Sequence, residues 1–408
     1  MAEPKKYKLL WISDSPRLHY IGQSVVGREI LSLLDRDIWD IGVVGFGDDN
    51  IRDPLPFDFK IHNVSREDMG KLDVMWTVLE NTKPDIVVMS HDIFIWPIVH
   101  QIKERFPNIK LVGYITVDGI PIFSGWKHLF YAYDLIITPT KWGRQELLNQ
   151  WLDLDVQAIP YGVHHNVFKP PAVDRAEFKK TIDKQSKDSP YNRPFKVADK
   201  FVGIYYGANQ TRKNLGAIYE GWKRFAVDKP DVTFFLITHS AILGNVYAGS
   251  YVLSSFMDAR GMEIFPSEIP LHHLVRFLGM SDVLLHPTMA EGFGLSVLEA
   301  MACGTVPITT SFSGHTDFCN PETAYMLDWT PLIGKYNLMQ AVASIDSVVS
   351  QLEHAYADWQ SGAIEQKRLA AMAIASSYSW TRTASMMSKA LKDVMERQEQ
   401  RLVVKHIV

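Results

Sequence analysis

Short apolar runs alternate with helix-like stretches along most of this 408-residue chain, and the alternation limits the folds open to it. In the first half of the chain, the apolar runs are 8–13, 41–46, 86–89, 111–115 and 135–137. The helix-like stretches between them include 24–34, 71–81 and 98–106. Strands that alternate with helices predict a parallel sheet with helices on both of its faces.

The same pattern starts again after a polar, proline-containing segment at 169–196. The second half of the chain has apolar runs at 201–205 and 233–237, and helical patterns at 215–227, 337–352 and 364–378. Its total length also exceeds the roughly 250–300 residues that one hydrophobic core serves. We therefore predict an α/β fold with two facing, doubly wound domains, whose strand C-termini would line a cleft between them.

The composition excludes few functions, but it bears on the binding partners and the cellular location of the protein. The net charge of −4 and the pI near 6.4 give no case for binding to nucleic acid or to a membrane across the whole surface. Only two cysteines occur, Cys303 and Cys319, and reduced thiols in a cytoplasmic protein are the simplest interpretation. Residues 1–16 lack the apolar run of a signal peptide, and no stretch approaches the roughly 20 apolar residues of a membrane span. Peripheral contact with a membrane stays open.

Residues 282–304, DVLLHPTMAEGFGLSVLEAMACG, point to a ligand. An apolar run leads to Glu291 and a glycine turn, and a helix-like stretch then carries Glu299. The order strand, glycine turn, helix aims backbone N–H groups and a helix N-terminus at an anion. Two carboxylates beside that anion would accept hydrogen bonds from hydroxyl groups, so the segment outlines a sugar-nucleotide site. The alternative is structural, because Ser296 and Glu299 also fit a capping box in which Glu299 bonds the start of its own helix.

This segment resembles the E-x7-E signature of the group-1 (family 4) glycosyltransferases. Glu291 and Glu299 fall on its two glutamates. The other matching positions are Gly292, Phe293, Gly294, Ala300, Met301, Ala302 and Gly304. The resemblance implies the fold called GT-B, with two facing Rossmann-like domains and the active site in the cleft between them. It also implies that Glu299 holds the ribose and that Glu291 holds sugar hydroxyl groups. The backbone N–H groups that it assigns to the diphosphate are those around Phe293, Gly294 and Leu295.

Arg212 and Lys213 stand in a polar turn between a predicted strand and a predicted helix. Cations fixed there would stabilise the charge that a diphosphate gains as its bond to the sugar breaks. The structural alternative is a solvated pair at a helix start. The segment resembles the family's diphosphate-binding turn, where a lysine such as Lys213 precedes an asparagine or glycine. The family's usual Gly-Arg pair is Gly207 and Ala208 here, so Arg212 substitutes for that arginine or the role is filled differently.

The first half of the chain matches the family less closely. Gly22 occupies the place of the family's glycine pair before the first helix, where a glycine lets the backbone approach a phosphate. Many relatives have His-Asp where this chain has Val117 and Asp118. Asp118 would then bond a sugar hydroxyl, orient the acceptor or simply cap its turn. His91 and Asp92 follow another predicted strand and form a second polar pair, although a histidine at a strand end more often has a structural role.

Two further segments resemble the connections between the family's domains. Residues 159–163 match the segment that leads from the first domain to the second, and 378–380 match the point where the final helix returns to the first domain. The expected parts of the chain are an acceptor-side domain at 1–168, a linker or insertion at 169–199, a nucleotide-sugar domain at 200–380, and a terminal segment at 381–408 packed on the first domain.

The candidate metal ligands are weak. The aspartate pairs at 35–37 and 153–155 have the D-x-D spacing of metal-dependent sugar transferases of another fold, but both lie at predicted helix ends and away from the glutamate motif. The adjacent histidine pairs at 164–165 and 272–273 would point in different directions on a helix. We expect no required metal and no cofactor, because the nucleoside-diphosphate sugar is the donor substrate.

The resemblance implies a cytoplasmic or membrane-peripheral transferase that moves a hexose-type sugar from a nucleoside-diphosphate donor with retention of configuration. The donor base stays open, and so does the acceptor among lipid, glycan, protein, small molecule and modified nucleic acid. Two alternatives remain. An epimerase or hydrolase of the same fold would convert the donor without an acceptor. A non-catalytic sugar-nucleotide-binding protein would not turn the donor over, which fits the missing histidine at Val117 and the altered Gly-Arg pair.

Overall fold

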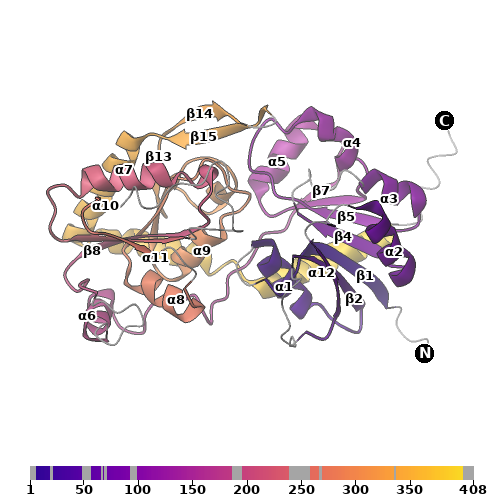
Figure 1. Ribbon diagram of the computed structural model, residues 1–408, viewed down its shortest axis with the longest axis horizontal. Helices are drawn as coiled ribbons and strands as arrows, with labels where there is room; N and C mark the ends of the chain where they lie inside the picture. Colours follow the sequence, from indigo (N-terminus) through magenta and orange to yellow (C-terminus); the bar gives the residue numbers. More distant parts are fainter. Residues whose placement is uncertain are drawn as a thin grey trace. The chain divides into compact units, whose positions relative to one another are not determined.

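The structure is a computed structural model. It describes residues 6–18, 22–47, 57–65, 68, 71–91, 99–185, 195–238, 258–265, 269–334 and 337–397. The chain divides into two compact units. Unit 1 comprises Met1–Gly162, Tyr336–Leu338 and Tyr378–Val408, and unit 2 comprises Val163–Lys335 and Met339–Ser377. Figure 1 shows that each unit is a sheet flanked by helices, so both are α/β structures.

Unit 1 is built on a parallel seven-stranded sheet with the strand order β3-β2-β1-β4-β5-β6-β7. Its strands are β1 (Tyr7–Asp14), β2 (Trp39–Phe46), β3 (Lys60–Val64), β4 (Ile86–Ser90), β5 (Lys110–Tyr114), β6 (Leu135–Thr138) and β7 (Val156–Ala158). Its helices are α1 (Gly22–Leu33), α2 (Leu72–Thr82), α3 (Val99–Arg105), α4 (Lys127–Phe130), α5 (Lys141–Gln150) and α12 (Trp380–Glu396). The order reverses between β1 and β4, and open α/β sheets bind ligands at the carboxyl ends of the strands at such a point.

Alternate side chains of the unit 1 strands pack on opposite faces of the sheet. Leu10 and Ile12 of β1 belong to the core cluster that also holds residues of α2, α3, α4 and α5. Trp11 is fully buried on the other face, where α1 approaches it closely at Gly27. Helix α12 packs against α1, and the Trp39 indole donates a hydrogen bond to Ser388 of α12 at 2.9 Å. Strands buried on both faces give continuous apolar runs, which is why the sequence predicts them.

Unit 2 has a parallel six-stranded sheet with the strand order β10-β9-β8-β11-β12-β13. Its strands are β8 (Phe201–Gly207), β9 (Val232–Thr238), β10 (Met262–Phe265), β11 (Val283–His286), β12 (Val306–Thr310) and β13 (Tyr325–Leu327), and a separate antiparallel hairpin joins β14 (Trp329–Ile333) to β15 (Met339–Ala343). Its helices are α6 (Arg175–Gln185), α7 (Leu215–Phe225), α8 (Leu271–Met280), α9 (Leu295–Ala302), α10 (Ile345–Ser361) and α11 (Ile364–Ala375). Here the strand order reverses between β8 and β11.

Aromatic side chains fill one face of the unit 2 sheet. Trp222 and Phe225 of α7 pack with Phe201 and Phe234 of the strands, and all four are at most 1% exposed. Helix α7 also packs on α10, because Gly221 leaves room for Val348. This core fixes β8, and with it the turn that β8 leads into.

One predicted helix is partly wrong. The apolar spacing of 337–352 predicts a single helix, but Met339–Ala343 forms β15 and α10 begins only at Ile345. Ser344 caps α10 by accepting a hydrogen bond from the backbone N–H of Ser347, so the helix starts there. The partner of β15 is β14, and the local spacing of apolar residues does not reveal a hairpin partner. The other predicted strands and helices that fall on described residues are confirmed to within a few residues.

Helix α6, which lies in the segment expected to be a linker or insertion, is held in unit 2 by buried charges. Lys179 of α6 donates a hydrogen bond to Asp282 Oδ2 at 2.6 Å, and the backbone N–H of Val202 donates to the same oxygen at 2.8 Å. Arg368 of α11 lies 3.6 Å from Asp282 Oδ1. Arg175 donates to backbone carbonyls at the carboxyl ends of α8 and α9. Asp282 is 1% exposed, so its ionised form is stable only because Lys179, Arg368 and the Val202 N–H lie next to it.

Replacing Asp282 with asparagine should destabilise unit 2 strongly. The substitution keeps the size of the side chain but leaves Lys179 buried without its counter-charge, which typically costs about 3–5 kcal/mol. Arg368 loses one of its two carboxylate partners and keeps Glu365. The free energy of unfolding, measured by urea denaturation with fluorescence of the buried tryptophans, checks this. The control is Asp258→Asn, which breaks the exposed pair with Lys223 and should change the stability little. Equal effects of the two substitutions would contradict the structural role of the buried cluster.

Candidate active site

The glutamate motif forms the strand, turn and helix that the sequence predicts. Strand β11 is buried along its whole length and ends at His286, and α9 begins at Leu295. Gly294 has a φ of +97°, which side chains rarely adopt, and a Cβ there would lie 3.1 Å from the Cβ of His315. Only glycine therefore closes this turn without strain, and the turn points the N-terminus of α9 toward the carboxyl edge of the sheet.

The capping box, the structural alternative for the motif, is not formed. The residue that caps α9 is Gly294, without a side-chain hydrogen bond, and Ser296 already lies inside the helix. The carboxyl group of Glu299 lies 2.7 Å from the hydroxyl oxygen of Tyr206, at the end of β8. Glu299 is therefore directed toward the neighbouring strand and not back to the start of its own helix.

Glu291 is the centre of the site, and its side-chain oxygen Oε1 is surrounded by donors. The Lys213 ammonium forms an ion pair with Oε1, and Arg212 Nη1 lies 3.2 Å from it. His286 Nε2 and the Thr288 hydroxyl both lie 3.1 Å from the same atom. The Glu291 side chain is only 7% exposed. Four side chains, two from the turn after β8 and two from the end of β11 and the turn after it, thus contact one carboxylate oxygen.

The charges around Glu291 keep it ionised. Burial alone would raise the pKa of Glu291, but the Lys213 and Arg212 cations and the hydrogen bond from His286 hold it well below its ordinary value. Burial lowers the pKa of His286, so the ring is neutral at pH 7. Two cations, one carboxylate and a neutral ring leave a net charge of about +1, which favours an anionic ligand.

The backbone joins the two turns that carry these groups. The turn after β8 is a short 3₁₀ segment, Thr211–Lys213, followed by α7. Met289 donates a backbone hydrogen bond to the carbonyl of Arg212 at 2.7 Å, and Arg212 Nη1 donates to the carbonyl of Ala290 at 3.0 Å. On the other side, Ala341 of β15 donates to the carbonyl of Met289 at 2.8 Å. Strand β15, in the segment predicted to be helical, is therefore hydrogen-bonded to the turn that carries Glu291.

A loop after β12 supports Glu291 from behind. Ser313 accepts a hydrogen bond from the backbone N–H of Glu291 at 2.8 Å, and Gly314 donates one to its carbonyl at 2.9 Å. Ser313 has a φ of +70°, a costly conformation for a residue with a side chain. A Cβ on Gly314 would lie 2.5 Å from the carbonyl oxygen of Gly292, so this position requires glycine. The strained backbone of Ser313 and the close packing of Gly314 indicate that this loop is fixed in place by its contacts with the Glu291 turn.

Glu299 has the opposite protonation behaviour from Glu291. Burial raises the pKa of Glu299 to about 7, and the hydrogen bond with Tyr206 only partly opposes the shift. The Tyr206 hydroxyl lies 2.8 Å from the carbonyl of Ser296 as well as 2.7 Å from Glu299 Oε2. The Tyr206 hydroxyl has one proton to donate, and it donates that proton to the carbonyl of Ser296. A protonated Glu299 then donates its own proton to the Tyr206 oxygen, so both contacts are hydrogen bonds.

The predicted site residues fall in both units. Glu291, Arg212 and Lys213 are brought into contact in unit 2, with Glu299 and the 292–295 turn on the same segment. Gly22, the exposed first residue of α1, and the half-buried Asp118, which follows β5, lie in unit 1. Their roles toward a ligand stay predictions.

In unit 1, His91 of the predicted His91-Asp92 polar pair lies next to the acidic side chain of Asp14. Asp92 lies outside the described residues, and His91 Nε2 lies 3.4 Å from Asp14 Oδ2. Asp14 ends β1 and His91 follows β4, and these strands are neighbours at the reversal point of the sheet. A search for polar residues at the ends of neighbouring strands would have found this pair.

Sequence reasoning missed four residues of the unit 2 site, namely His286, Thr288, Ser313 and Tyr206. The signal for His286 and Tyr206 was their place at the end of an apolar run, because the carboxyl ends of parallel strands meet at one edge. Ser313 carried no signal, since its left-handed backbone and its contact with Glu291 arise only from the fold.

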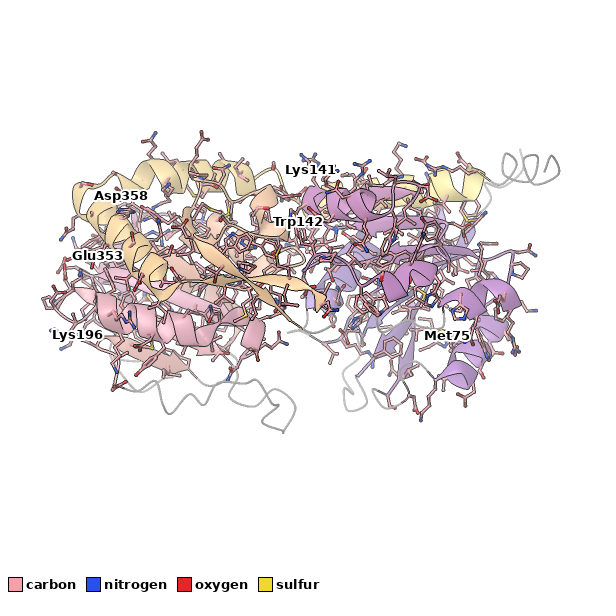
Figure 2. All side chains as sticks on the ribbon, turned by 90° about the horizontal axis from the view of Figure 1, so that it is seen from above. Met75, Lys141, Trp142, Lys196, Glu353 and Asp358 are labelled. Carbon is pink, nitrogen blue, oxygen red and sulfur yellow. The ribbon has the colours of Figure 1, made fainter. Side chains whose placement is uncertain are left out.

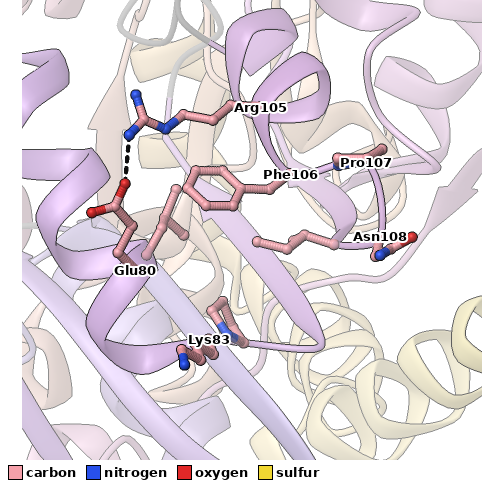
Figure 3. A pocket seen from close by; sticks show the side chains of 9 residues that line it. Glu80, Lys83, Arg105, Phe106, Pro107 and Asn108 are labelled. Carbon is pink, nitrogen blue, oxygen red and sulfur yellow. Dashed lines mark hydrogen bonds and ion pairs between the residues drawn. The ribbon is translucent and has the colours of Figure 1, made fainter.

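A groove with a volume of about 450 Å³ lies elsewhere, on unit 1 (Figure 3). Its lining residues are Leu79, Glu80, Lys83, Pro84, Arg105, Phe106, Pro107, Asn108 and Ile109. They lie just before β4 and β5 or at the ends of α2 and α3, at the amino ends of the strands. Arg105 and Glu80 pair with each other across the groove, as the dashed line in Figure 3 marks. Ligands of such sheets bind at the opposite edge, so we do not assign the groove to the active site.

The described residues hold neither a candidate metal cluster nor a candidate membrane-spanning helix. They contain no group of three His, Cys, Asp or Glu side chains placed to hold a metal ion, and the expectation that no metal is required stays a prediction. Within the same part of the chain, no helix is both long enough and apolar enough to span a membrane.

Two α/β units with parallel sheets are the architecture of the GT-B glycosyltransferases, and solved structures of that class match the chain over nearly its whole length. Sucrose-phosphate synthase from Thermosynechococcus elongatus matches with a TM-score of 0.74 and 14% identity, over 96% of this chain and 100% of that one. The Anabaena HepE protein, solved with UDP and glucose, matches with a TM-score of 0.66 and 13% identity, over 95% and 100%. At such low identity the likeness establishes the GT-B fold alone.

The sequence comparisons point to one family within this class. Residues 187–355 match the family model described as glycosyl transferases group 1. D-inositol 3-phosphate glycosyltransferase of Arthrobacter sp. (strain FB24) is 28% identical over 152 residues, which are 36% of this chain and 34% of that protein. The chain spans about half or less of the length of the curated relatives it matches. The chain is thus similar in sequence to the group-1 glycosyltransferases over residues 187–355, and it has the GT-B fold.

The raised pKa of Glu299 predicts a pH-dependent stability. Its folded pKa of about 7 exceeds the ordinary value of 4.5, so the stabilisation by the neutral carboxyl is present below about pH 4.5 and is lost as the pH rises through 7. Glutamine imitates the neutral carboxyl, so the stability of Glu299→Gln should rise relative to wild type between pH 5 and pH 8. Urea unfolding of both proteins across this range measures the difference, and a constant difference would contradict the shifted pKa.

Proposed function

We propose that this protein is a glycosyltransferase that moves a hexose-type sugar from a nucleoside-diphosphate donor to an acceptor with retention of configuration. The observation that carries the proposal is the convergence of Lys213, Arg212 and His286 on the ionised Glu291 beside the N-terminus of α9. A donor of this class is an anion joined to a polyol. The site offers cations and helix N–H groups for the anion, and a carboxylate for the hydroxyl groups.

The cations retain capacity for a phosphate while they are paired with Glu291. An ammonium has three N–H donors and a guanidinium has five, and Glu291 Oε1 occupies only one direction around each. Arg212 is 34% exposed at its side chain, so solvent or a ligand reaches it. When the bond from the sugar to the diphosphate breaks, negative charge grows on the phosphate oxygen, and these fixed cations stabilise that change more than the bound donor.

The proposed transfer forms one bond and breaks one. The acceptor oxygen bonds to the anomeric carbon of the sugar while the bond from that carbon to the diphosphate oxygen breaks. The acceptor proton passes to the departing phosphate oxygen, on the same face, which gives retention without a separate protein base. Glu291 holds sugar hydroxyl groups, and Glu299 holds the ribose. A site closed to water would favour transfer to the acceptor over hydrolysis.

Donor and acceptor are proposed only by class. The Anabaena structure was solved with UDP and glucose, which supports a uridine nucleotide as the first donor to test. The Arthrobacter relative is named for transfer to an inositol phosphate, which supports a small polyol phosphate as the first acceptor. Gly22 and Asp118 of unit 1 are the residues we propose for contacts to phosphate and to acceptor or sugar hydroxyls.

Nucleotide release from UDP-, GDP-, ADP- and TDP-sugars tests the function. Wild type should release nucleotide slowly from one donor, and Glu291→Ala should abolish release, because the carboxylate that holds the sugar is gone. The matched control is Glu353→Ala on α10, labelled in Figure 2, whose exposed side chain pairs with Lys229. It should keep the wild-type rate. Wild-type-like release by Glu291→Ala would remove Glu291 from the mechanism.

The same assay separates the alternatives. Nucleotide release at the full rate, unchanged by any acceptor, would identify a hydrolase. An isomeric nucleotide sugar formed from the donor without nucleotide release would identify an epimerase. Tight donor binding without turnover would identify a sugar-nucleotide-binding protein. Neither release nor binding with any donor would mean that the glutamate motif serves only the fold.

Replacing Lys213 with alanine should lower the rate of transfer about 10²–10³-fold, the usual effect of removing one group that stabilises a charged transition state. The loss should appear in kcat, because the charge on the leaving group is greatest in the transition state. Lys223→Ala on the exposed face of α7 is the matched control and should leave kcat unchanged. A loss for Lys213→Ala confined to KM would contradict the catalytic role and leave a role in ground-state binding.

A further inference from the structure

His286 is a fully buried histidine whose ring forms a hydrogen bond with the ionised Glu291 carboxylate. It ends β11, is fully buried and stacks on the ring of Tyr205, with ring centroids 6.0 Å apart. Its Nε2 lies 3.1 Å from Glu291 Oε1. Its Nδ1 is enclosed and, among the described residues, has no hydrogen-bond partner. The carboxylate of Glu291 is thus the one side-chain group that the ring contacts through a hydrogen bond in the part of the chain that the structure describes.

The protonation state of His286 follows from its neighbours. The groups that face it are Glu291, Lys213 and Arg212, together with the buried ring of His315 and the phenol of Tyr205. Burial lowers its pKa, the two cations lower it further, and Glu291 only partly opposes them. The ring is therefore neutral with a single N–H. An ionised carboxylate only accepts, so that proton lies on Nε2 and His286 donates to Glu291.

The donors around Glu291 are distributed unequally between its two oxygens. Lys213, Arg212, His286 and Thr288 all contact Oε1. No donor from the described residues is recorded at Oε2, and Oε2 is not among the enclosed polar atoms without a partner. The second oxygen therefore keeps contact with solvent. The carboxylate is held by one oxygen and presents the other.

We propose that His286 is a positioning residue, which, with Thr288 and the two cations, fixes Glu291 through Oε1 and so presents Oε2 to one hydroxyl group of the donor sugar. This inference rests on the proposed function. A neutral donor suits the task, because a third cation would raise the charge of a buried site, whereas an apolar residue would remove one of the four donors that hold Oε1. The backbone carbonyl of His286 accepts a hydrogen bond from Thr309 at 3.0 Å, which helps to fix this strand end.

The test compares three substitutions of His286. Glutamine places an N–H near the position of Nε2, asparagine is too short to reach Glu291, and phenylalanine keeps the stacking on Tyr205 without a donor. Phenylalanine and asparagine should lower kcat about 10²-fold, the effect of misplacing a reacting group by about 1 Å. Glutamine should restore most of the rate. Calorimetric titration with the nucleoside diphosphate alone should give similar affinities for all variants, because the sugar is absent, and this also shows that each variant is folded.

Donor analogues that each lack one sugar hydroxyl give a readout that a merely structural role would not move. Wild type should lose rate sharply with the one analogue that lacks the partner of Oε2. The loss of rate with that one analogue should be smaller in His286→Phe than in wild type, and in His286→Gln it should again be close to the wild-type loss. A general loss of stability would instead reduce the rates with all donors in proportion.

The outcomes separate this inference from the function on which it rests. If wild type turns over a donor and His286→Phe keeps both its rate and its selectivity among the analogues, the positioning role is wrong and the proposed function stands. The positioning role is also wrong if glutamine is no better than asparagine. If wild type turns over no donor while it binds the nucleotide, the proposed function is wrong, and the positioning role falls with it.

Discussion

A carboxylate buried as deeply as that of Glu291 is stable only next to positive charge, and the strand order of unit 2 supplies that charge. β8 and β11 are paired neighbours at the point where the sheet order reverses. The turn after β8 carries Arg212 and Lys213, and the turn after β11 carries Glu291. An unpaired buried carboxylate would cost several kcal/mol, so both turns must be in place before the site is stable. The hydrogen bond between Met289 and the Arg212 carbonyl holds them together.

A buried acidic residue lies directly before strand β11 and another lies in the turn after it, and comparing the two separates structure from function. Asp282 precedes the strand and is 1% exposed, with its two carboxylate oxygens shared among Lys179, Arg368 and a backbone N–H. Glu291 follows the strand, with all its recorded side-chain partners on one oxygen. The Asp282 carboxylate, with a charged partner from the fold at each oxygen, serves the fold. A carboxylate with one oxygen in contact with solvent is suited to a ligand.

The two glutamates of the motif also differ in charge at neutral pH, for physical reasons that lie in their neighbours. Glu291 faces two cations and stays ionised, whereas Glu299 faces the phenol of Tyr206 and has a pKa of about 7. A neutral histidine completes the first group and keeps its net charge near +1. On the proposed function, the positive charge is thereby concentrated where the diphosphate lies, and the ribose side of the site carries little charge.

The sequence by itself determined the alternation of buried strands and helices, the glycine turn at Gly294 and the segment that carries Glu291 and Glu299, because these depend on local period and local backbone geometry. It also indicated Arg212 and Lys213 as a cationic turn. Only the tertiary structure decided that these cations touch Glu291, that His286 donates to it and that Ser313 supports it, since each contact joins segments whose spacing is set by strand order. It likewise decided that 339–343 is a strand, because its hairpin partner β14, and not its own apolar spacing, fixes its conformation.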